Sequence, residues 1–153
     1  PVTVVAAGAK AILDLAKTYE VLETLGVPVI AFGQDMLPAF WSASSDMAAP
    51  LRMDGASDIA RAQMTRTAMG LSGGQLIANP IPKDAEIPAD VLRPIIDQAL
   101  KEADAQGVSA KAVTPFLLGR IFELTDGQSL TANIALVRNN ARLAAQIAIA
   151  MGK

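Results

Sequence analysis

The chain has 153 residues, of which 52% are hydrophobic and 4% aromatic, and its formal net charge is −2. This length suits a single domain whose core is filled by Ala, Ile, Leu and Val, and the charge gives no electrostatic reason to expect nucleic acid or an anionic membrane as a partner. The chain has no Cys and no His, which excludes disulfides, a thiolate nucleophile, a Ser-His-Asp triad and an ordinary zinc site. The absence of Cys fits a reducing compartment, so we expect a cytoplasmic protein. No apolar run reaches the roughly 18 residues of a membrane span.

The first third of the chain predicts a strand, a helix and a second strand. Residues 2–7 and 27–32 are short apolar runs rich in β-branched residues, as in buried strands. Residues 12–25 carry apolar side chains at helical spacing, and Gly26 follows as a typical helix end. The helical stripe consists of Leu15, Tyr19, Leu22 and Leu25. A strand, a helix and a strand within about 30 residues are typical of a parallel βαβ unit.

A long irregular connection and a second helix are predicted next. Residues 33–56 contain the only tryptophan, Trp41. A connection of this length is more often a lid or an interface arm than a plain link, so the loop around Trp41 is a candidate for either. Residues 57–69 are expected to be helical, with Ser57 as the N-cap and Gly70 at the end.

The second half of the chain predicts one more strand and three helices. Residues 73–82, GGQLIANPIP, read as a strand whose prolines exclude a helix. A helix is expected over residues 88–106, and another opens at Thr114 and Pro115, which fit the cap and first helical positions. Residues 129–151 form the last and longest predicted helix. The alternation of strands and helices indicates an α/β protein with three layers.

The last helix carries an apolar stripe at alternating spacings of four and three residues. Its members are Leu130, Ile134, Val137, Ala141, Ala144, Ala148 and Met151. The alanines would let a neighbouring backbone approach closely, so we expect this stripe to pack tightly on a sheet or a sister helix. A coiled-coil oligomer is the alternative.

A single lysine, Lys10, follows the first predicted strand. Ligands of open α/β sheets gather at the carboxyl ends of the strands, and Lys10 lies just beyond one. The small residues around Gly8 would leave room for a substrate against the backbone. Apolar surroundings would disfavour the charged form of the amine through desolvation, and a neutral amine can attack a carbonyl-like carbon. The alternative is a solvated lysine at a strand edge.

Three asparagines, Asn133, Asn139 and Asn140, lie in the Ala- and Leu-rich last helix, where a buried amide needs a hydrogen-bond partner. Asn133 falls in the first turns, where helices often meet ligands. Its amide offers both a donor and an acceptor, which suits the edge of a pyrimidine or another amide. The alternative for Asn133 is an interhelical hydrogen bond, and Asn139 is expected on the surface.

Other polar residues carry weaker signals. Lys111 and Thr114 lie between apolar residues, and Thr114 is explained as an N-cap. The adjacent glycines of LSGGQLIANP match no phosphate-binding motif and are expected to form a turn. Four aspartates show no metal-binding spacing and would hold Mg²⁺ or Mn²⁺ only if folding brought two together. They are Asp35, Asp46, Asp54 and Asp58.

Four long strings together resemble one family over nearly the whole chain. The strings are TVVAAGAKAILDL, LETLGVPVIAFG, GGQLIANPIP and AKAVTPFLLGRIFELTDGQSLTANIALVRNNARLAAQIA. They are similar to the pseudouridine-5′-phosphate glycosidases, also called the indigoidine synthase A-like family. The resemblance implies a three-layer α/β/α domain with a mixed, largely parallel sheet. It is confined to the carboxyl-terminal half of such enzymes, so we expect residues 1–153 to be that half of a single domain.

The activity implied by the resemblance is that of pseudouridylate synthase, grouped with the carbon–oxygen lyases. Such enzymes reversibly split the carbon–carbon bond of pseudouridine 5′-phosphate to give uracil and ribose 5-phosphate, with Mn²⁺, in nucleotide catabolism. A lysine amine bonds covalently to C1 of the opened ribose and leaves an imine. That lysine lies in the string AGAK, here Lys10, and the uracil-contacting asparagine lies in ANIALV, here Asn133. Members usually have Cys where this chain has Ala6, a position without the nucleophile's role.

The resemblance also implies residues that this chain lacks. The glutamate proton donor, the aspartate that holds Mn²⁺ and most phosphate contacts are expected in the missing amino-terminal half, so the chain alone should be inactive. Such enzymes typically form homotrimers. Two alternatives stay open: a related sugar-phosphate or pigment-pathway enzyme with the same imine chemistry, and a non-catalytic half-domain that acts as an assembly partner.

Overall fold

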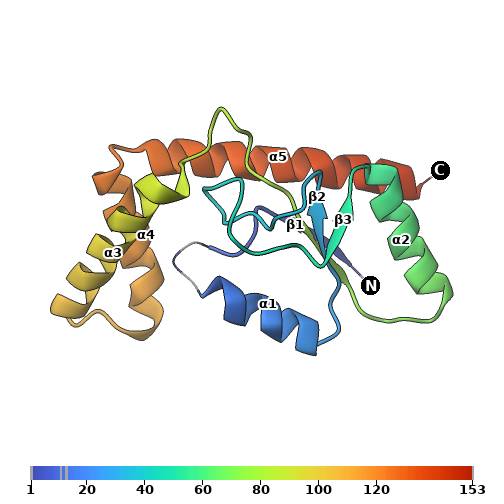
Figure 1. Cartoon of the computed structure of the whole chain (residues 1–153), viewed down its shortest axis with the longest axis horizontal. Helices are drawn as coiled ribbons and strands as arrows, with labels where there is room; N and C mark the ends of the chain where they lie inside the picture. Colours follow the sequence, from blue (N-terminus) through green and yellow to red (C-terminus); the bar gives the residue numbers. More distant parts are fainter. Residues whose placement is uncertain (1, 11, 13, 153) are drawn as a thin grey trace.

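Figure 1 shows the computed structural model of the chain, which describes residues 2–10, 12 and 14–152. Four strands form one sheet in the order β1-β4-β2-β3, and every neighbouring pair is parallel. The strands are β1 (Thr3–Ala6), β2 (Val29–Phe32), β3 (Leu51–Met53) and β4 (Gln75–Ala78). The α/β class is confirmed, and the four described strands are parallel throughout rather than mixed.

Three of these strands coincide with predicted apolar runs, whereas β3 lies inside the segment that is irregular in the sequence-based prediction. It has three residues and contains Arg52, so it is too short and too polar for the alternation of a strand to be recognised. β3 is an edge strand, and Arg52 binds two carboxylates, Asp35 at 3.0 Å and Asp54 at 2.8 Å.

Helices cover both faces of the sheet, because the side chains of β2 and β4 alternate between two apolar clusters. Ile30 and Ile77 pack with α2 (Ala56–Ala68) and α5 (Gln128–Met151) on one face. Ala31 and Ala78 lie on the other face, in the cluster that contains Tyr19 of α1 (Leu15–Thr24). The expected three layers are present. Among the described residues, none of the helices combines the length and apolar character needed to cross a membrane.

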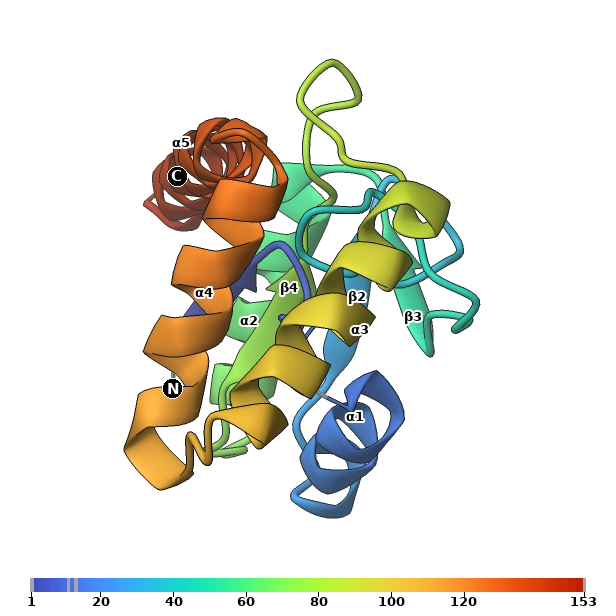
Figure 2. The same ribbon diagram turned by 90° about the vertical axis from the view of Figure 1, so that its left-hand side faces the viewer.

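A helical hairpin stands beside the sheet and has a core of its own (Figure 2). It consists of α3 (Ala89–Ala105), a short 3₁₀ helix η1 (Ala110–Ala112) and α4 (Val113–Leu124). Leu92 and Ile121 of the hairpin are buried in one cluster with Trp41 and with Leu136 of α5. This cluster joins the hairpin to the carboxyl end of the sheet.

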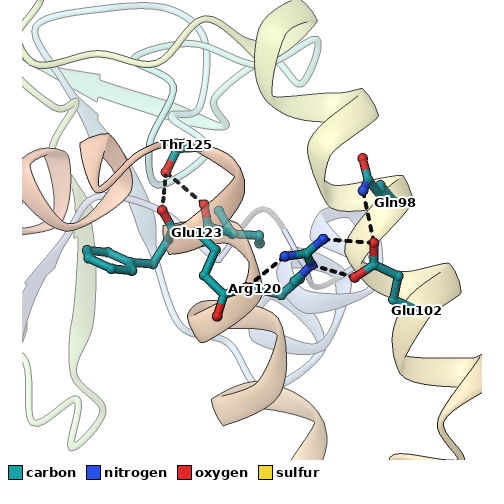
Figure 3. A network of polar contacts seen from close by, with 7 residues as sticks. Gln98, Glu102, Arg120, Glu123 and Thr125 are labelled. Carbon is teal, nitrogen blue, oxygen red and sulfur yellow. Dashed lines mark hydrogen bonds and ion pairs between the residues drawn. The ribbon is translucent and has the colours of Figure 1, made fainter.

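An ion-pair network ties the two hairpin helices together on the outside (Figure 3). Arg120 of α4 bonds to Glu102 of α3 at 2.5 Å through Nε and to Glu123 at 2.7 Å through Nη1. Gln98 donates a further hydrogen bond to Glu102. The hydrogen bond from Arg120, followed by that from Gln98, holds the pKa of the Glu102 carboxyl below its ordinary value.

Both predicted N-caps are wrong. Helix α2 begins one residue earlier than expected, so Gly55 is its N-cap and Ser57 lies inside the first turn. Helix α4 continues directly from η1, so Ala112 stands at the cap and Thr114 lies within the first turn. The adjacent glycines before β4 do not form a turn, so the turn expected there is wrong. A Cβ on Gly74 would lie 2.5 Å from the carbonyl oxygen of Val2, so this glycine permits the close approach of β1.

The apolar stripe predicted on the last helix is not packed on the sheet or on another described helix. Helix α5 turns another face inward, on which the buried residues are Ser129, Ala132, Leu136, Leu143 and Ile147. The stripe residues Leu130, Ile134 and Val137 are 49%, 53% and 55% exposed. The prediction is wrong because α5 carries two apolar faces, and residue spacing alone does not show which of them meets the sheet.

Candidate active site

Lys10 lies beyond a tight turn that follows β1, at the carboxyl end of the sheet. The lysine is half-buried. Its side chain is therefore neither fully buried nor fully exposed to solvent. Gly8 in this turn adopts a φ of +88°, and a Cβ there would lie 2.0 Å from the carbonyl oxygen of Pro38. The space beside Gly8 is therefore filled by the loop after β2. It is not left open for a substrate, as the small residues had suggested.

Tyr19 of α1 holds the same turn from the other side. Its hydroxyl oxygen accepts a hydrogen bond of 3.4 Å from the amide of Ala9, the residue before Lys10. Burial raises the pKa of the Tyr19 hydroxyl, so it stays neutral over the physiological range. The helical stripe indicates Tyr19 only as a core residue. Its role in fixing the backbone next to Lys10 depends on a long-range contact that residue spacing does not reveal.

The long loop after β2 connects the Lys10 turn to the start of α5. The amide of Phe40 donates a hydrogen bond of 2.8 Å to the carbonyl oxygen of Ala7. The next residue, Trp41, is 3% exposed and donates from Nε1 to the carbonyl oxygen of Ser129 at 3.1 Å. The loop is thus fastened into the core at Trp41, and the role of the loop as a lid or an interface arm stays a prediction.

These contacts bring Asn133 into the same region as Lys10. Ala7, at the head of the Lys10 turn, and Ala132, next to Asn133, belong to one buried cluster together with Trp41. Asn133 lies one helical turn after Ser129 and is half-buried. Two residues that are 123 positions apart in the sequence are therefore held at the same end of the sheet.

The three asparagines of α5 differ in their hydrogen bonds. Asn139 donates to the carbonyl oxygen of Pro80 at 3.0 Å, and Asn140 accepts from the side chain of Asn79 at 3.0 Å. These two side chains attach α5 to the residues that follow β4, so the surface position expected for Asn139 is wrong. Asn133, in contrast, makes no side-chain hydrogen bond to another described residue, so the alternative of an interhelical bond is not realised there. None of the described side chains or backbone groups therefore occupies its amide.

A cavity of about 380 Å³ opens where β2 and β4 end. Gly33 and Asn79 line it from the strands, and Asn139 and Arg142 line it from α5. Neither Lys10 nor Asn133 lines this cavity. A larger cavity of about 520 Å³ lies between α1 and α3, and Ile12 is the lining residue nearest to Lys10 in the sequence. The carboxyl end of the sheet is thus open at more than one place, as expected for a ligand-binding edge.

The described residues offer no metal centre. They contain no group of three or more Asp and Glu side chains that could hold an ion. Folding does bring Asp35 and Asp54 together, but both carboxylates bind Arg52, which occupies one oxygen of each and offsets one of the two negative charges. Asp58 is paired with Arg61. The carboxylates of the described part of the chain therefore do not fit a Mn²⁺ site.

A family model described as "Indigoidine synthase A like protein" matches residues 1–150 of the chain. The chain belongs to the indigoidine synthase A-like family. Within this family, pseudouridine-5′-phosphate glycosidases of Paracoccus denitrificans and Jannaschia sp. are 72% and 70% identical to it over 151 residues. Each alignment covers 99% of this chain and 50% of the relative. The chain therefore spans about half the length of these curated relatives.

Two solved structures share the fold. The prealnumycin C-glycosynthase AlnA, in complex with ribulose 5-phosphate, superposes with a TM-score of 0.89 at 33% identity. An indigoidine synthase A-like protein from Thermotoga maritima superposes with a TM-score of 0.88, also at 33% identity. These superpositions cover 97% and 99% of this chain and 49% and 50% of the solved chains. The family likeness thus extends to the complete arrangement of strands and helices described above.

Proposed function

We propose that the chain supplies the nucleophile and a uracil-binding residue to a pseudouridine-5′-phosphate glycosidase. The single observation that carries this proposal is the placement of Lys10 and Asn133. Both are half-buried at the carboxyl end of the sheet, and neither side chain pairs with another described residue. The identity of about 70% to pseudouridine-5′-phosphate glycosidases supports the same substrate.

The reaction needs covalent help because the bond to be cleaved joins two carbons. An ordinary glycosidase protonates a leaving oxygen, and uracil attached through carbon offers no such atom. Ring opening would break the bond between C1 and the ring oxygen, which takes up a proton, while electrons of the uracil ring form a double bond to C1. The lone pair of Lys10 Nζ would then add to C1, and the electron pair of that double bond would return to the uracil ring. Uracil would leave with the electron pair of the broken carbon–carbon bond and take up a proton. Water would then hydrolyse the imine, releasing ribose 5-phosphate and the free amine.

Asn133 would bind the uracil while this bond breaks. The side-chain amide has an N–H donor and a carbonyl acceptor, which complement a neighbouring carbonyl and N–H on the edge of uracil. The Trp41–Ser129 hydrogen bond ties the start of this helix to the loop that contacts the Lys10 turn, which supports a shared site for Asn133 and Lys10. A fixed position of the base relative to the amine accounts for part of the rate, since orientation lowers the entropy cost of the attack.

The remaining catalytic groups would come from the half of the relatives that this chain does not match. We assign the glutamate proton donor, the Mn²⁺ ligand and most phosphate contacts to that half, and homotrimers to the assembled enzyme. The proposal therefore concerns the complete enzyme, and the chain alone is expected to be inactive.

The test uses a chimera in which this chain replaces the matching half of the Paracoccus denitrificans relative. We expect the chimera to release uracil from pseudouridine 5′-phosphate in the presence of Mn²⁺. Lys10→Ala should abolish this release without lowering the melting temperature, because Lys10 makes no hydrogen bond or ion pair to another described residue. Lys111→Ala is the matched control, since Lys111 is an exposed lysine that belongs to η1 and not to the Lys10 turn. Normal turnover by the Lys10→Ala chimera would refute the proposal.

A second candidate function is a related sugar-phosphate reaction. It is favoured by the likeness to a C-glycosynthase that was solved with ribulose 5-phosphate. Two activities of the chimera are compared: its cleavage of pseudouridine 5′-phosphate, and its reaction of other pentose phosphates with a ring compound as acceptor. The comparison separates the two candidates. Preference for pseudouridine 5′-phosphate supports the first. A folded chimera with no activity on any of them would favour a non-catalytic assembly partner.

A further inference from the structure

The exposed side of α5 is unusual for a surface helix. From Leu130 to Ala148 the stripe contains only Leu, Ile, Val and Ala and extends about 27 Å along the helix axis. The solvent-facing side of a helix normally carries charged or polar residues. Arg138 and Arg142 lie on a different side of α5, so no charge interrupts the stripe. In Figure 1, α5 runs along one side of the molecule from the hairpin to α2.

The sheet edge next to α5 is also left uncovered by the described residues. Helix α5 packs against β1, which forms an outer edge of the sheet. The carbonyl oxygens of Val2 and Ala6 accept hydrogen bonds from the β4 side, so the backbone groups of Thr3 and Val5 point to the open edge. On the face of β1 that α5 does not cover, Val4 is 48% exposed.

The opposite edge of the sheet is protected in the usual way. Edge strand β3 has three residues, and its central residue Arg52 is held by two carboxylates. Short length and charge are devices that prevent a further strand from adding to an edge. The sequence of β1, TVVA, has no charge and no proline. The two edges therefore differ in a way that favours occupation of β1 and not of β3.

We infer that the α5 stripe and the open edge of β1 form one docking surface for the segment equivalent to the unmatched half of the relatives. The occupant would add a strand beside β1 and lay apolar side chains over Leu130, Ile134 and Val137. This inference rests on the proposed function, since it names the partner that completes the same enzyme. The lengths of the solved structures support this occupant over a second copy. This chain spans only 49% to 50% of two solved chains of the same fold. The other half of each solved chain has apolar surface of its own to bury, and the exposed faces described here are where it could pack.

Docking at this surface would also complete the proposed site. Asn133 and Asn140 lie on α5 between the stripe and the buried face, so an occupant that covers Ile134 reaches the neighbourhood of Asn133. The groups missing from this chain would thereby approach Lys10 and Asn133 from the open side. The docking surface thus accounts for both the exposed apolar side chains and the incomplete set of catalytic groups.

The test places one substitution in two contexts, this chain alone and the chimera with the Paracoccus half. In the chain alone, Ile134→Asp should leave the urea midpoint unchanged, because Ile134 is exposed. In the chimera the same change buries a carboxylate and should lower the midpoint by on the order of 0.5–1 M. Met64→Asp on α2 is the matched control, since Met64 is 47% exposed, and it should have no effect in either context. Amide exchange of Thr3 and Val5 should be fast in the chain alone and slowed in the chimera.

Equal midpoints for wild type and Ile134→Asp in the chimera, or fast exchange of Thr3 and Val5 there, would overturn the inference. So would light scattering that shows the chain alone associating through this surface, with Ile134→Asp making it monomeric, because the occupant would then be a second copy. These readouts do not depend on turnover. A folded but inactive chimera with a lowered Ile134→Asp midpoint would refute the proposed function and leave the docking surface intact.

Discussion

Polar side chains are treated differently in two regions of this molecule. In the α3–α4 hairpin, Arg120, Glu102 and Glu123 satisfy one another in an ion-pair network. At the carboxyl end of the sheet, Lys10 and Asn133 are half-buried and find no partner among the described residues. Both side chains remain partly open to water, and polar groups of this kind can exchange a bound water for a ligand. The contrast separates residues whose contacts stabilise the fold from residues that we propose to act on the substrate.

Trp41 offers the largest expected effect on stability and tests the connection between the two regions. Trp41→Ala removes a buried ring and the hydrogen bond to Ser129, and should lower the free energy of unfolding by about 3–5 kcal/mol. Trp41→Phe keeps most of the ring and loses only the hydrogen bond, so it should cost about 1–3 kcal/mol. Urea unfolding of the chain measures both. A neutral Trp41→Ala would show that the loop does not hold the start of α5.

Asn133 and Asn140 provide a matched pair on one helix. Asn133→Ala should lower kcat/KM of the chimera by about 10- to 100-fold, the loss of one or two hydrogen bonds to uracil, with unchanged stability. Asn140→Ala leaves Asn79 without its partner and should instead cost about 1 kcal/mol of stability. Steady-state kinetics together with urea unfolding separates the two effects. If Asn133→Ala destabilised the chain as much as Asn140→Ala, the distinction between paired and available amides would fail.

The smallest expected effect concerns the hairpin and depends on pH. The pKa of Glu102 is lowered from its ordinary value of 4.5 by Arg120 and Gln98, so its ion pair stabilises the fold above that value. This contribution is lost as the pH falls below 4.5 through the folded-state pKa. Glu102→Gln should therefore be less stable than wild type at neutral pH, and the difference should vanish in acid. The control is Glu20→Gln, which removes an exposed carboxylate. A difference that persisted unchanged in acid would contradict a stabilising role for this ion pair.

The apolar strands were predictable, and the polar contacts were not. Runs such as VPVIAF identify β2, and Gly26 ends α1 as expected. The sequence placed Asn133, Asn139 and Asn140 on one helix, but their partners depend on which face of α5 meets the residues after β4. Successive residues of a helix point about 100° apart, so a small error in the assumed buried face exchanges paired and unpaired asparagines. The same uncertainty caused the apolar stripe to be assigned to the wrong surface.

The proposed active site depends on a covalent bond between Lys10 and the sugar. The most direct measurement is reductive trapping: the chimera is incubated with pseudouridine 5′-phosphate and Mn²⁺, treated with borohydride, digested and analysed by mass spectrometry. We predict a reduced pentose-phosphate adduct on the peptide that contains Lys10, absent from the Lys10→Ala chimera. Release of uracil with no adduct on that peptide, or with the adduct on another lysine, would contradict the role of Lys10 as the nucleophile.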